Sequence, residues 1–258
     1  MIEIFSRSCR RLRRDRSATR FARVADLFVH AADELAGRLA ESGRAFDRAL
    51  DLGCRDGRLG RRLPAETVIA LDCGYRFALI ARGAQADEDR LPFGDAVFDL
   101  IASVGALHTV NDLPGALIQL RRALRPGGRF VAVLPGGEEL TPLRRALFEA
   151  EELLFGGVHA RTHPMLDPRE APSLLQRAGF ANPVVDVEPL RLRYRDLFAL
   201  IADLRAGGET NVLTDRAPRF TRALAAASAA RFADLGDEDG RVTVEASLIY
   251  LTADAPAG

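Results

Sequence analysis

The sequence predicts an α/β fold in which a doubly wound, mostly parallel sheet is covered by helices on both faces. Two observations carry this prediction. From residue 46 onward, short apolar runs alternate with helical stretches, which is the pattern of a parallel sheet. The chain has 258 residues, of which 48% are hydrophobic, so it can bury one substantial core. The runs expected as strands are 49–52, 67–71, 98–103, 129–134, 184–187 and an antiparallel C-terminal strand, 242–252.

One domain spanning 1–258 is expected, with three kinds of segment. Residues 1–44 read as N-terminal helices and 45–135 as a cofactor-binding core, while 136–180 and 195–232 are expected as helical cap insertions. A helix over 113–124 should end before the turn 125–128, because proline and paired glycines stop helices.

A basic helix is expected over 8–23, followed by a second helix over 25–42 with leucines and alanines on one face. Three interpretations of the basic helix stay open: a solvated helix or lid over the core, a site for an anionic partner, and an organelle transit peptide. Glu3 and Asp15 count against the last, since transit peptides avoid acidic residues. The arginines in and beside this segment are Arg7, Arg10, Arg11, Arg13, Arg14, Arg16, Arg20 and Arg23.

Charge and cysteine content exclude several classes of function. Thirty-six basic and thirty-six acidic residues cancel, which gives no reason to expect nucleic acid as a partner. No apolar run is long enough for a transmembrane segment, and we expect a cytoplasmic protein. Three cysteines without a CxxC pattern argue against a structural zinc site, and no metal site is expected. His159 and His163 are four apart but lie in an expected loop.

The stretch 48–60 runs from a strand into a glycine-punctuated turn and an expected helix. Gly53 permits a sharp turn, Gly57 permits close approach of a ligand, and free N–H groups at a helix start favour an anionic group. A dinucleotide fingerprint fits poorly, because Arg55 and Arg58 stand where its second and third glycines belong. The string Asp-Leu-Gly-Cys-Arg-Asp-Gly at 51–57 instead resembles the first motif of class I S-adenosylmethionine-dependent methyltransferases, whose fold is Rossmann-like.

That resemblance implies S-adenosylmethionine as cofactor and a set of residues that would bind it. Asp72 ends the second strand and would accept hydrogen bonds from the ribose hydroxyls, and Asp87, in a stretch matching the superfamily's adenine-binding segment, would take the adenine amino group. Arg55 replaces a motif glycine and either crowds the methionine moiety or pairs with its carboxylate. Fifteen residues separate Asp72 from Asp87, so the helix or the strand between them should be truncated. The remaining expected cofactor contacts are Asp51, Gly53, Cys54, Gly57, Cys73, Glu88 and Ser103.

Four further stretches, near 110–114, 134–140, 176–180 and 203–211, resemble the mitochondrial complex I assembly factor with a methyltransferase fold and its bacterial homologues. The malonyl-acyl-carrier-protein methyltransferases of biotin synthesis are similar in the same regions. The resemblance implies methyl transfer to a small-molecule or protein acceptor. Alternatively, it implies an assembly factor that hydroxylates or chaperones a complex I subunit. Loss of cofactor binding through Arg55 and the short 72–87 segment is a third reading. Substrate-side candidates are His108, Tyr194 and Asn211, each equally explained by packing, and no catalytic residue is assigned.

Overall fold

The computed structural model describes residues 3–137, 140–215 and 217–257, and a seven-stranded sheet organises them. The strand order is β3-β2-β1-β4-β5-β7-β6, and β7 is antiparallel to both of its neighbours while the other pairings are parallel. The expected mostly parallel sheet with an antiparallel C-terminal strand is therefore confirmed. The strands are β1 Phe46–Leu52, β2 Ala65–Asp72, β3 Ala84–Gln85, β4 Phe98–Val104, β5 Leu124–Gly136, β6 Ala181–Tyr194 and β7 Val242–Asp254.

The helices, in chain order, are α1 Arg7–Ser17, α2 Ala25–Glu41, α3 Tyr75–Ile80, α4 Leu113–Ala123, α5 Thr141–Phe155, α6 Ala171–Arg177, α7 Leu197–Gly207 and α8 Arg222–Ala233. Three single turns of 3-10 helix, η1 Phe21–Arg23, η2 Gly60–Arg62 and η3 Leu107–Thr109, complete the set. The basic helix expected over 8–23 is shorter than predicted, since it ends at Ser17 and resumes only as η1.

Alternating residues of each strand supply two apolar layers. Ala49 and Val131 face α2, whereas Leu50 and Phe130 face the layer that α4 and α6 cover. The two sets separate because successive side chains of a strand point to opposite faces of the sheet. The result is a three-layer core. Because β1, β2, β4 and β5 pair in parallel, their carboxyl ends lie at one edge of the sheet.

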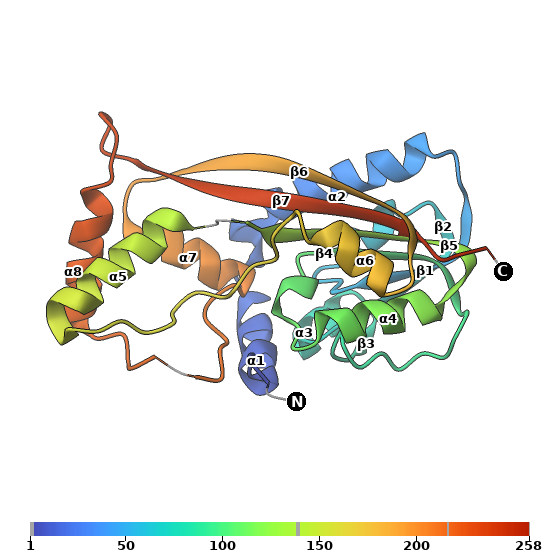
Figure 1. Cartoon of the computed structure of the whole chain (residues 1–258), viewed down its shortest axis with the longest axis horizontal. Coiled ribbons are helices and arrows are strands. Elements are labelled where there is room, and N and C mark those ends of the chain that lie inside the picture. Colours follow the sequence, from blue (N-terminus) through green and yellow to red (C-terminus); the bar gives the residue numbers. More distant parts are fainter. Residues whose placement is uncertain (1–2, 138–139, 216, 258) are drawn as a thin grey trace.

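A cap of α5, α7 and α8 stands beyond one end of the sheet (Figure 1). Its core includes Leu143, Leu200 and Phe232 and is continued by Val242 and Val244 at the start of β7. The expectation that all of 136–180 forms cap is wrong in one part: α6 packs on the sheet beside α4, because Leu174 and Leu175 join the main core. Helix α1 lies between the cap and the sheet.

No helix in the described part of the chain has the length and apolar character needed to cross a bilayer.

Candidate functional site

The glycine loop follows β1 at the carboxyl edge of the sheet. The N–H groups of Gly53 and Cys54 both donate to the carbonyl of Leu71 at the end of β2, at 2.7 and 3.0 Å, which anchors the loop between the two strands. Gly53 and Gly57 both have a φ of 73°, the left-handed region that favours glycine. The turn that the sequence predicts here is confirmed.

The buried side chain of Asp51 stabilises this loop through a hydrogen bond. Its Oδ2 accepts the N–H of Gly60 at 2.9 Å, and its side chain is buried. Burial raises the pKa of Asp51 to about 7, against the opposing effect of the Gly60 hydrogen bond. The carboxylate thus acts within the loop in this conformation, and a direct contact with a cofactor stays a prediction.

The helix expected after the loop does not form. After the loop the chain makes only the single turn η2 and then enters β2 at Ala65. The stretch of chain between Gly57 and Ala65 therefore contains no α-helix. The backbone N–H of Arg61 bonds to the carbonyl of Gly57, at 3.3 Å. The expected anion site at a helix N-terminus is therefore absent from this loop.

Arg55 has a φ of 47°, so it holds the left-handed backbone that a glycine would adopt more easily. Its guanidinium donates to the carbonyl oxygens of Gly207 and Gly105, at 2.7 and 3.1 Å, and lies 4.0 Å from the ring centre of Phe28. Burial and the nearby Arg14 lower the pKa of Arg55 to about 10. The side chain therefore contacts the cap and α2 and fills space beside the loop.

Glu209 joins the cap to this loop. Its Oε1 lies 2.6 Å from Nη2 of Arg55 and 3.8 Å from Nη1 of Arg14, and its Oε2 lies 2.8 Å from Nε2 of His108. Burial alone would raise the pKa of Glu209, but His108, Arg55 and Arg14 outweigh it and hold the pKa well below its usual range. Glu209 was not among the predicted site residues, although it lies in the 203–211 stretch that resembles the assembly factor.

Asp72 ends β2, as expected, and is fully buried. Its Oδ2 accepts the N–H of Arg55 at 3.1 Å and its Oδ1 accepts the N–H of Gly74 at 2.7 Å. Nε of Arg14, from α1, lies 3.4 Å from Oδ1. Both oxygens that would meet a ribose are thus already engaged by this chain.

The segment between Asp72 and Asp87 contains both a helix and a strand, each very short. Helix α3 has six residues and β3 has two, which confirms the expected truncation. Strand β3 still pairs in parallel with the end of β2, and the carbonyl of Asp72 accepts the N–H of Ala86 at 3.1 Å. The short connection therefore places the acidic run that begins at Asp87 beside the end of β2.

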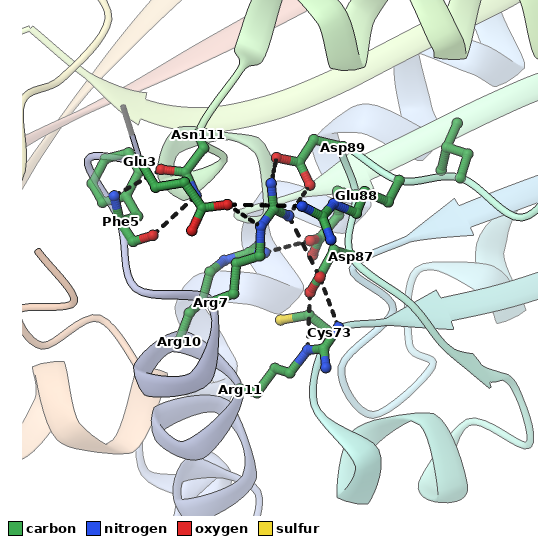
Figure 2. A network of polar contacts seen from close by, with 12 residues as sticks. Glu3, Phe5, Arg7, Arg10, Arg11, Cys73, Asp87, Glu88, Asp89 and Asn111 are labelled. Carbon is green, nitrogen blue, oxygen red and sulfur yellow. Dashed lines mark hydrogen bonds and ion pairs between the residues drawn. The ribbon is translucent and has the colours of Figure 1, made fainter. Parts of the chain in front are cut away.

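Arginines of α1 reach this acidic run, as Figure 2 shows. Arg11 bonds to both oxygens of Asp87 at 3.1 and 2.7 Å, and Arg10 pairs with Glu88 at 2.5 Å. Arg7 pairs with Asp89, which the sequence-based set omitted. The signal was present, because positions 7, 10, 11 and 14 have the spacing of one helix face. Of the three interpretations of the basic helix, the structure favours a lid over the core.

The other predicted contacts have structural partners. Ser103 is buried and donates its hydroxyl to the carbonyl of Leu52 at 2.9 Å, which ties β4 to β1. Cys54 and Cys73 are buried free thiols at the ends of β1 and β2, and burial raises the pKa of both. They line the loop region as apolar groups, in line with the sequence-based expectation.

A cavity of about 650 Å³ opens between the cap and the carboxyl edge of the sheet. The three substrate-side candidates all line it. Burial raises the pKa of the Tyr194 hydroxyl. Asn211 donates to the carbonyl of Ala160 at 3.2 Å and accepts the N–H of Leu213 at 2.8 Å, so its amide also anchors a loop. Nδ1 of His108 is buried and has no hydrogen-bond partner among the described residues.

The space beside the glycine loop is far smaller. A cavity of about 20 Å³ lies between Arg55 and Phe28, whereas small-molecule sites commonly span about 300–1,000 Å³. Among the described residues, no group of three histidine, cysteine or acidic side chains is placed to hold a metal ion.

His163 makes a hydrogen bond that requires a neutral ring. Its Nε2 accepts the N–H of Val212 at 3.1 Å, and its ring packs edge-on against Phe5 with centres 5.6 Å apart. Burial, together with His108, lowers the pKa of His163 to about 4. The unfolded chain therefore takes up a proton first as the pH falls below about 6.5, and stability that is present at neutral pH is lost between about pH 6.5 and 4.

Because of His163, we expect the free energy of unfolding to fall by about 1–2 kcal/mol when the pH is lowered from 7.5 to 5.0. Urea unfolding at both pH values measures this loss. The His163→Gln variant keeps an acceptor without a titratable ring, so it should lose less stability over the same interval. Equal losses in the two proteins would show that His163 does not set this pH dependence.

Comparison with known proteins adds independent findings. Residues 50–132 match the family described as "Methyltransferase domain". The chain is 30% identical to "Arginine-hydroxylase NDUFAF5, mitochondrial" of Danio rerio, and the match covers 97% of this chain and 82% of that protein. The match to the human protein of the same name covers 66% of that protein. It is 34% identical to the malonyl-[acyl-carrier protein] O-methyltransferase of Xylella fastidiosa, covering 80% of this chain and 73% of that one. The YcgJ protein of Bacillus subtilis shares the fold, with a TM-score of 0.61 and 17% identity, over 88% of this chain and all of that one.

Proposed function

The chain belongs to the class I S-adenosylmethionine-dependent methyltransferase superfamily, and we propose that it transfers a methyl group from S-adenosylmethionine to an acceptor bound in the cap cavity. The observation that carries this proposal is the position of Asp72 and Asp87. Both carboxylates lie at the carboxyl edge of the sheet beside the glycine loop, where ligands bind in this type of fold.

The chemistry of these two acceptors fits the adenosine part of the cofactor. A carboxylate at the end of β2 suits a pair of hydroxyl donors, and a second carboxylate after β3 suits an amino donor. The space does not fit in this conformation, because α1 and Arg55 fill the region between these carboxylates and the loop. Binding therefore requires α1 to move.

The cap cavity supports an acceptor that carries a negative charge on an apolar body. Apolar side chains, with leucine the commonest, form most of its wall. Of its arginines, Arg13, Arg205 and Arg219 have no carboxylate within 4.0 Å among the described residues, whereas Arg23 is paired with Asp203. Unpaired guanidinium groups in a partly desolvated cavity favour a carboxylate or phosphate. A carboxylate acceptor is already nucleophilic and needs alignment more than a general base.

A second candidate function is modification or chaperoning of a respiratory complex I subunit. It is favoured by the similarity to the Danio rerio protein along nearly the whole chain. It is also favoured by Glu209, which lies in the 203–211 stretch and connects the cap to α1 and to the glycine loop. Affinity purification of the tagged chain separates the two candidates, since recovery of complex I subunits supports the second and recovery of acyl-carrier protein supports the first.

We expect S-adenosylhomocysteine at millimolar concentration to raise the melting temperature of the protein, because a ligand that binds the folded state stabilises it. Asp87→Asn keeps the size of the side chain and removes the charged acceptor, so it should reduce the shift. Glu66→Gln, on the exposed start of β2, is the matched control and should keep it. Absence of a shift in the wild type and in variants that free α1 would contradict the proposed cofactor.

A further inference from the structure

Four arginines on one face of α1 each reach a different carboxylate, three at the predicted cofactor site and one, Asp89, directly beside it. Arg14 approaches Asp72. Figure 2 shows the other three pairs, in which Arg11 bonds to Asp87, Arg10 to Glu88 and Arg7 to Asp89. We propose that α1 is an internal competitor of the cofactor: its guanidinium groups occupy the carboxylates that would bind adenosine, and the site opens only when α1 is displaced. This inference rests on the proposed function.

The pairing is direct and largely desolvated. The side chains of Asp72, Asp87 and Glu88 are no more than 2% exposed, and that of Arg10 is 9% exposed. Arg10 also donates to Thr109 Oγ1 and to the carbonyl of Ala106, at 2.9 and 3.0 Å. A ligand that needs Asp87 or Glu88 must therefore displace the guanidinium groups of Arg11 and Arg10, which already bond to them.

Helix α1 also blocks the site sterically, in addition to pairing with its carboxylates. A Cβ placed on Gly74 would lie 3.0 Å from Cβ of Arg14 and 3.2 Å from Oδ1 of Asp72. The helix thus passes directly over the turn that follows β2, where the ribose of the cofactor is expected.

Helix α1 and the residues before it are held by ion pairs and by backbone hydrogen bonds, such as that from the N–H of Ser6 to the carbonyl of Val212, and α1 makes little apolar contact. Its one leucine, Leu12, is 47% exposed, and the apolar contact near its start is confined to Cys9 with Phe5, Val212 and Leu213. A helix with so little buried apolar surface gains little from the hydrophobic effect. When α1 lifts, four guanidinium groups leave and uncover carboxylates that attract a positively charged ligand, which S-adenosylmethionine is.

The first test compares the affinity for S-adenosylhomocysteine of three full-length proteins by calorimetry. Arg7→Gln/Arg11→Gln weakens the contacts to Asp87 and Asp89 while leaving the buried Arg10 in place. Arg16→Gln/Arg20→Gln is the matched control, since these exposed arginines contact no carboxylate in the described part of the chain. We expect about tenfold tighter binding than wild type in the first variant, because a larger fraction is open, and no change in the control. Equal affinities in all three, or weaker binding in the first variant, would overturn the inference and leave the proposed function standing.

A reversible lock tests the movement without relying on charge. In the Arg14→Cys/Gly74→Cys protein the two Cβ atoms start 3.0 Å apart, about half an ångström below the usual range for a disulfide, so a small shift of α1 allows the bond. We expect the oxidised form to bind S-adenosylhomocysteine at least tenfold more weakly than the same protein after reduction, with mass mapping confirming the intended bond. Equal binding in the oxidised and reduced forms would overturn the inference. Absence of binding by the wild type, the Arg7→Gln/Arg11→Gln protein and the reduced protein would overturn both the inference and the proposed cofactor.

Discussion

Replacing Glu209 by glutamine is expected to lower the free energy of unfolding by about 2–4 kcal/mol. The glutamine keeps the shape of the side chain but removes the charge that Arg55, Arg14 and His108 share. The guanidinium of Arg55 would then stay buried without a carboxylate, and the pKa of Arg55 is already lowered by burial and by Arg14. The expected loss is below that for a fully buried pair, since the Glu209 side chain is 24% exposed.

A double-mutant cycle with Arg55→Gly isolates the central pair. In the Arg55→Gly background, Glu209→Gln should lower the free energy of unfolding by at least 1 kcal/mol less than it does in the wild type. The reason is that the guanidinium of Arg55, which would otherwise lose its partner, is absent. Urea denaturation of the four proteins at pH 7.5 gives the coupling energy. Additive costs would mean that Glu209 stabilises the protein through its other contacts and not through Arg55.

Gly53→Ala is expected to destabilise the protein by more than 3 kcal/mol. Its Cβ would overlap Cβ of Ala106, in the turn after β4, and its φ of 73° is unfavourable for any side chain. Gly43→Ala is the matched control: its φ is 63°, but no atom lies within 4 Å of the added Cβ. The control should therefore lose about 1 kcal/mol, the cost of the backbone conformation alone.

Differential scanning calorimetry of both alanine variants separates the two contributions. A loss in Gly53→Ala no larger than that in Gly43→Ala would show that the loop and the turn at Ala106 can move apart freely. The same result would weaken the argument that the loop is rigid enough to hold a ligand in one place.

Much of the fold could be predicted from local patterns. Short apolar runs between helical stretches placed β1, β2, β4, β5, β6 and β7, and the Pro-Gly-Gly sequence correctly predicted where α4 ends. The sharp turn at Gly53 followed from the absence of a Cβ, and its φ of 73° agrees with it. The helix expected after the loop was wrong, because a glycine-punctuated turn after a strand can lead into a single 3-10 turn as well as into an α-helix.

The sequence by itself determined the class of fold, the position of the glycine loop and the acidic residues at the ends of β2 and after β3. These depend on neighbours in the chain and on the period of strands and helices. Only the tertiary structure decided what those acidic residues contact. Arg11 and Asp87 are 76 residues apart, and Arg55 and Glu209 are 154 apart. Charge pairing depends on distance in space, so the chain order of these residues could not show that α1 lies on the predicted cofactor site.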